Sequence, residues 1–196
     1  MVAGIPEVPN PVRALRRYWK DRSTSLTPAL IFDELMGESH RATVMLGAAL
    51  LDDTLTYRIS ESLVIKPDEK QFDYIFRFEG PLGTFSARIE IAYLFELIDG
   101  VTRGQLDDIR EMRNACAHST KHMSFATNEL INVARRVYKI TPERPGEMTP
   151  KRRQARFALE VLYLWQVIQK GRKQGIKHIG QVIGELLAEQ PPSSDK

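Results

Sequence analysis

The feature that most constrains the fold is the run of residues 39–63, where apolar side chains recur at helical spacing. Val44, Leu51, Leu55 and Ile59 follow one another at intervals of seven or four residues. This period places them along one side of an α-helix of about seven turns. A long helix with one apolar stripe must bury that stripe against neighbouring elements. The run therefore favours a protein built by packing helices together.

Helix starts are marked elsewhere in the chain by capping residues. Thr27-Pro28 and Thr149-Pro150 each combine an N-cap residue with a proline suited to the first helical position. Thr84 and Thr102 are further N-cap candidates, and each precedes a segment with apolar residues at helical spacing. We therefore expect helices after all four positions.

Weaker helical patterns cover residues 126–138 and 176–189. Residues 71–83 carry alternating aromatic side chains but have no obvious partner strand, and they are predicted as an aromatic-rich connector packed on the bundle. No strong strand pattern and no internal repeat occur in the sequence. The prediction is an all-α protein, a single helical bundle of about five to seven helices.

The predicted helical bundle domain spans residues 27–189. Residues 1–26 are predicted to form a basic N-terminal arm that is partly disordered, and residues 190–196 a disordered tail. The basic residues of the arm are Arg13, Arg16, Arg17, Lys20 and Arg22.

Composition narrows the setting in which we expect the protein to act. No run approaches the ~20 apolar residues that span a bilayer, and the first residues lack the pattern of a secretory signal. The single cysteine, Cys116, excludes an internal disulfide and a cysteine-based zinc site. We expect a cytoplasmic protein that has no membrane partner and needs neither a metal nor a cofactor.

Charge is distributed unevenly along the chain. Residues 33–111 hold sixteen acidic and eight basic side chains, whereas residues 135–178 hold twelve basic and three acidic ones. This asymmetry indicates a polyanionic partner or self-association of unlike faces, unless the charges only solvate helix faces. Four basic residues near a helix start oppose the helix dipole, so we expect nucleic-acid phosphate or an acidic protein beside them. They are Lys151, Arg152, Arg153 and Arg156.

Arg113, Asn114 and His118 lie near the end of a predicted helix. In metal-independent RNA cleavage, a histidine can move a proton, an arginine can stabilise phosphoryl charge, and an amide can orient the scissile phosphate. Arg113 and His118 are about 140° apart on a helix, so an intact helix aims them differently. They converge if the helix unwinds or if two chains combine their copies. The structural alternative is that His118 stabilises the helix C-terminus.

Glu38, Arg41 and Asp52 are expected to line a pocket with Asn114 and His118. The alternative is that they complement a helix dipole or remain on the surface. Ser86 and Arg88 follow Gly80 and Gly83 and are expected to add donors to a generic anion site at a helix N-terminus, unless the segment is only a turn that enters a helix. We refer to these five residues as the polar set: Glu38, Arg41, Asp52, Ser86 and Arg88.

Three motifs in order resemble the mannitol operon repressor family over about residues 30–135. They are Glu38-Ser-x-Arg41 leading to Asp52-x-x-Leu55, then Pro81-Leu-Gly-Thr-Phe-Ser-Ala-Arg-Ile89, then Arg113-Asn-x-x-Ala-His118-Ser. The resemblance implies an all-helical bacterial protein that represses a sugar-alcohol operon without a conventional DNA-reading domain. The family's motif positions map to Glu38, Arg41, Asp52, Ser86, Arg88, Arg113, Asn114 and His118.

A broader similarity is to HEPN domains, helical bundles in which an Arg-polar-x-x-x-His segment forms a composite ribonuclease site at a dimer interface. We therefore expect a homodimeric, non-enzymatic transcriptional regulator that acts through protein or nucleic-acid binding. The alternative is a HEPN-type, toxin-like endoribonuclease that uses Arg113, Asn114 and His118 at its dimer interface. A protein–protein adaptor, whose basic arm meets an acidic partner, is a third hypothesis.

Overall fold

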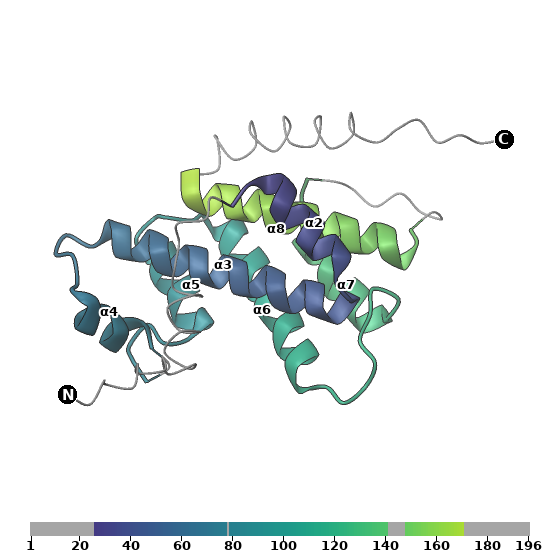
Figure 1. The fold of residues 1–196 in the computed structure, drawn as a ribbon, viewed down its shortest axis with the longest axis horizontal. Coiled ribbons are helices and arrows are strands. Elements are labelled where there is room, and N and C mark those ends of the chain that lie inside the picture. The colour runs from purple at the N-terminus through teal and green to yellow at the C-terminus, as the bar shows by residue number, and fades with distance from the viewer. Residues whose placement is uncertain (1–25, 78, 141–147, 171–196) are drawn as a thin grey trace, which may run out of the picture.

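The computed structural model describes residues 26–77, 79–140 and 148–170, which form helices without any strand (Figure 1). The all-α prediction is therefore confirmed for the described part of the chain. The helices are α2 (Pro28–Gly37), α3 (His40–Ser62), α4 (Glu69–Phe76), α5 (Phe85–Leu94), α6 (Gly100–His118), α7 (Asn128–Val137) and α8 (Pro150–Lys170).

Side-chain caps explain where most of these helices begin. Thr27 caps α2, Ser39 caps α3 and Thr84 caps α5, each by accepting a hydrogen bond from a backbone N–H three residues later. At the start of α8, the hydroxyl of Thr149 accepts from the N–H of Arg152 at 3.2 Å. Helix α6 begins before Thr102, the N-cap predicted from the sequence, because Asp99 is its N-cap.

The segment predicted as an aromatic-rich connector is partly helical, so that prediction is wrong for α4. Asp68 and Gln71 form a reciprocal capping box, in which each side chain accepts a hydrogen bond from the other residue's backbone N–H. Phe72 and Phe76 lie one turn apart on α4, and their ring centroids are 4.7 Å apart. The aromatic residues thus follow a helical period instead of the alternation of a strand.

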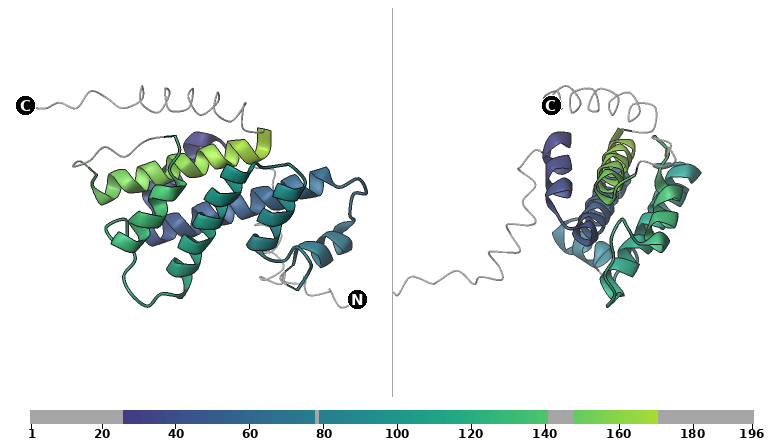
Figure 2. Two further views of the ribbon diagram at one scale, coloured as in Figure 1. Left: turned by 180° about the vertical axis from the view of Figure 1, so that it is seen from behind. Right: turned by 90° about the vertical axis from the view of Figure 1, so that its right-hand side faces the viewer.

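Helices α3 and α8 pack against each other at the centre of the bundle. Figure 2 shows α2 on one side of this pair and α6 with α7 on the other. Gly47 permits the close approach, because a Cβ atom there would lie 2.9 Å from Cγ2 of Val161. The core is continuous through α6, where Cys116 is buried and burial raises the pKa of its thiol.

Helix α8 carries a buried carboxyl group. Glu160 is fully buried, and its Oε1 accepts hydrogen bonds from the backbone N–H groups of Lys139 and Ile140. Its Oε2 has no hydrogen-bond partner among the described residues. Burial raises the pKa of Glu160 from 4.5 to about 7, although the two backbone donors oppose that shift.

Several predicted segments lie outside the described residues. These are the basic arm up to residue 25, the helix expected at 176–189 and the tail at 190–196. None of the described helices has the length and apolar character needed to cross a bilayer.

Candidate functional site

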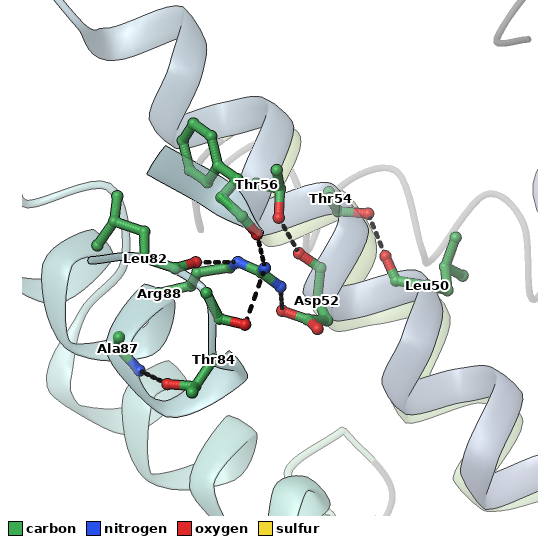
Figure 3. A network of polar contacts seen from close by, with 10 residues as sticks. Leu50, Asp52, Thr54, Thr56, Leu82, Thr84, Ala87 and Arg88 are labelled. Carbon is green, nitrogen blue, oxygen red and sulfur yellow. Dashed lines mark hydrogen bonds and ion pairs between the residues drawn. The ribbon is translucent and has the colours of Figure 1, made fainter. Parts of the chain in front are cut away.

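Arg88 of α5 joins three parts of the structure (Figure 3). Its Nη1 donates to Oδ1 of Asp52 on α3 at 2.5 Å. Its Nε donates to the carbonyl of Leu82 at 2.8 Å, and its Nη2 to the carbonyl of Phe76 at 2.8 Å. The guanidinium therefore holds the segment between α4 and α5 against α3, and its donors are occupied by the protein itself.

Asp52 forms an ion pair with Arg88, and only 21% of its side chain is exposed to water. Burial raises its pKa, while the hydrogen bond and charge of Arg88 and the charge of Arg113 lower it. The net direction is upward, so desolvation exceeds the stabilisation that the cations supply. The Asp52–Arg88 pair is thus best described as a structural connection between helices.

A cleft of about 750 Å³ opens beside this pair, between α3, α4, α5 and α6. Arg113 of α6 reaches it, and its Nη1 donates to Oδ1 of Asn114 at 3.0 Å. The remaining lining mixes apolar and charged side chains: Met45, Ala48, Ala49, Asp52, Asp53, Thr56, Tyr57, Ser60, Glu69, Phe72, Asp73, Phe76, Arg77 and Arg88.

His118 does not join Arg113 and Asn114. Helix α6 continues unbroken to His118, which is exposed at its last position. No hydrogen bond links His118 to either residue in the described part of the chain. The two directions expected for an intact helix are therefore observed, and a single chain does not assemble the expected catalytic trio.

The charged residues of the polar set lie in two places. Arg41, at the start of α3, donates to the backbone carbonyls of Ser119 and Lys121, immediately after α6. Glu38 lies beside it, and its carbonyl accepts a hydrogen bond from Nε2 of Gln154 at 2.9 Å. Asp52 and Arg88 lie elsewhere, at the larger cleft.

Ser86, the fifth member of the set, is exposed in the first turn of α5. Its side chain makes no hydrogen bond to any other described residue. The segment between Gly80 and α5 is thus a turn that enters a helix, held by Arg88.

A smaller hollow of about 390 Å³ lies next to Arg41. Its walls come from the start of α3 and from the loop after α6: Glu38, Ser39, His40, Arg41, His122, Met123 and Ser124. The ring of His40 meets that of Phe125 edge-on, with centroids 5.5 Å apart. Burial lowers the pKa of His40, and the charge of His122 lowers it further.

Sequence reasoning did not pair His40 with His122, because 82 positions separate them in the chain. Their proximity depends on the antiparallel packing of α3 and α6, which brings the start of one helix to the end of the other. Arg41 is the one residue of the sequence motifs that points to this hollow, because it belongs to the first motif and contacts the loop that holds His122.

The four cations predicted to contact a partner have different environments. Lys151 and Arg152 are exposed in the first turn of α8. Arg153 is half-buried and donates to the carbonyl of Phe125 at 3.2 Å. Arg156 is only 8% exposed, with its guanidinium carbon 4.0 Å from the ring centroid of Tyr138. Arg156 is therefore a packing residue, and the prediction of a partner contact there is not supported.

Within the described residues, no group of three or more His, Cys, Asp or Glu side chains is arranged to hold a metal ion. Comparisons of the chain with protein-family models, with curated proteins and with solved structures found no match.

Proposed function

We propose that this protein is a non-enzymatic transcriptional regulator that binds nucleic acid through one end of its bundle. This surface, the basic end, comprises His40 and Arg41, residues 118–122 and residues 151–153. In Figure 1, α3 and α8 both begin at the right-hand end of the molecule, while α4 lies at the left.

The observation that carries the proposal is the convergence of cations from three distant segments. Arg41 bonds to the carbonyl of Lys121 at 3.3 Å, and Arg153 bonds to the carbonyl of Phe125 in the same loop. These contacts bring the exposed cations Lys121, Lys151 and Arg152 to the basic end. Beside them lie Glu38 and the part-buried Arg41 and Arg153, whose guanidinium groups also bond to backbone carbonyls. Clustered cations of this kind bind phosphate backbones and release counterions.

Two further points support a regulator over an enzyme. Arg113 and His118 of one chain have different neighbours, and Arg88 is held by the protein's own acceptors. A non-enzymatic role also agrees with the resemblance to the mannitol operon repressor family. We include a homodimer in the proposal, because two copies of the basic end would double the phosphate contacts made by each complex.

The test compares two triple variants of the full chain for binding to labelled RNA and DNA. Lys121→Gln/Lys151→Gln/Arg152→Gln removes three exposed cations from the basic end. Lys66→Gln/Lys70→Gln/Arg77→Gln removes three exposed cations near α4 and changes the net charge equally. We expect affinity at about 0.1 M salt to fall about tenfold or more in the first variant and to change little in the second.

Three outcomes contradict the proposal. Absence of binding to either nucleic acid, or equal losses in the two variants, means that the basic end is not the contact surface. RNA cleavage that is lost in His118→Ala, with an unchanged thermal midpoint, supports the metal-independent endoribonuclease instead.

A further inference from the structure

We infer that the hollow lined by His40 and His122 is a proton-linked phosphate subsite of the basic end. It receives one phosphate of the bound nucleic acid, and its imidazoles take up protons as that phosphate enters. The inference rests on the proposed function and adds to it a location for one phosphate and a dependence on pH.

The geometry supplies a recess lined by two histidines from different segments. His40 belongs to α3 and His122 to the loop after α6, and both line the same hollow of about 390 Å³. Arg41 fixes the separation of the walls, because its guanidinium bonds to two carbonyls of the loop. The edge-on contact with Phe125 orients the ring of His40. The recess therefore exists without requiring the loop to move.

The chemistry of the recess selects an anion. Burial disfavours the protonated form of His40, and the charge of His122 disfavours it further. A phosphate between them offsets that repulsion and provides oxygen acceptors for their N–H groups. Ser39 and Ser124 line the same recess.

The surrounding charges determine the sign of the pH dependence. Arg41 lies next to His40 on α3, Lys121 next to His122 in the loop, and Arg153 of α8 bonds beside Phe125. Glu38 is the acidic residue that lines the recess. Phosphate adds negative charge, so the complex binds protons more readily than the empty protein does. Affinity must therefore fall as pH rises through the range where imidazole titrates, about pH 6 to 7.5.

The experiment measures the affinity of the full chain for one labelled DNA duplex at constant ionic strength, from about pH 5.5 to about pH 8.5. We expect about a fivefold or larger loss of affinity across this range in the unmodified protein. In His40→Gln/His122→Gln the dependence should be largely lost.

Two controls keep the test decisive. His118→Gln removes an exposed histidine of the basic end outside the hollow and should retain most of the dependence. If the double variant fails to fold, His122→Gln alone alters only an exposed side chain and should reduce the dependence about twofold. Calorimetry in buffers with different ionisation enthalpies should detect proton uptake on binding.

The outcomes separate this inference from the proposed function. If DNA binds but the double variant, or His122→Gln in its place, keeps the full pH dependence, the subsite is wrong and the basic end stands. If no nucleic acid binds at any pH, the proposed function fails and the subsite fails with it.

Discussion

Two ion pairs of similar geometry show how burial decides the role of a charged residue. Arg88–Asp52 and Arg77–Asp73 each have an N–O distance of 2.5 Å. The side chain of Arg88 is 11% exposed, whereas that of Arg77 is 68% exposed. The two acids are similarly exposed, 21% for Asp52 and 26% for Asp73, so the contrast lies in the arginines. Arg88 also donates to two backbone carbonyls away from water, whereas Arg77 lies mostly in water.

We expect Arg88→Gln to lower the free energy of unfolding by about 2 to 4 kcal/mol, because it strands Asp52 and two carbonyl groups. Arg77→Gln is the matched control and should cost less than about 1 kcal/mol. Urea denaturation followed by circular dichroism measures both changes. Equal losses in the two variants would mean that the connection between α3 and α5 has no special structural role.

Arg113 and His118 show what the spacing of two residues on a helix can predict. The angle between positions 113 and 118 on a helix predicts that their side chains diverge, and α6 is intact through both. Spacing does not reveal their neighbours, because these come from other helices. Arg113 faces the cleft that holds Asp52, whereas the residues that follow His118 contact Arg41.

At the scale of elements, the position of α8 depends on one close approach to α3. A Cβ atom at Gly47 would lie 2.9 Å from Cγ2 of Val161 and 3.2 Å from Cε1 of Phe157. Both neighbours are fully buried side chains with little room to move. The absence of a side chain at position 47 therefore fixes the distance between the two central helices.

We expect Gly47→Ala to lower the thermal midpoint, because overpacking costs about 1 to 3 kcal/mol and exceeds the gain in helix propensity of about 1 kcal/mol. Gly104→Ala in α6 is the control, since no atom lies within 4 Å of the added Cβ. It should raise the midpoint through propensity alone. Scanning calorimetry of both variants tests the contrast, and a stabilised Gly47→Ala would refute it.

Capping residues predict most of the described helix starts. The prediction fails at α4, where the capping signal is not recognised. Thr27, Thr84 and Thr149 all begin helices where the sequence indicates. The start of α4 carries an equally local signal, the capping box of Asp68 and Gln71. The alternation of aromatic residues obscured it, because a segment of two turns gives too few positions to separate a period of 2 from one of 3.6.

At the scale of the whole molecule, buried titratable groups act on stability in opposite directions. Burial raises the pKa of Asp52, Asp108 and Glu160, so the stability linked to these groups is lost as pH rises through their native values. Burial lowers the pKa of His40, so stability linked to it is lost as pH falls. The carboxyl groups therefore stabilise the fold most at low pH, and the imidazole of His40 stabilises it most at high pH.

We expect Glu160 to dominate the fall in stability between about pH 5 and about pH 8. A native pKa of about 7, against 4.5 when the chain is unfolded, corresponds to a loss of about 3 kcal/mol across that interval. Glu160→Gln keeps an oxygen acceptor for the backbone donors and cannot titrate. The difference in unfolding free energy between the two proteins should therefore grow with pH, as measured by urea denaturation in a series of buffers. A difference that stays constant with pH would show that the pKa of Glu160 is the same in the native protein as in the unfolded chain.

Cys116 is the one cysteine of the chain, and α6 places its side chain inside the core. Its thiol is therefore shielded from maleimide reagents for as long as the bundle stays closed. A second cysteine introduced on the surface, for example at Lys121, would accept a fluorophore at a single position without removal of the native one. The fold thus provides its own background-free attachment point for single-molecule spectroscopy of whatever docks beside that loop.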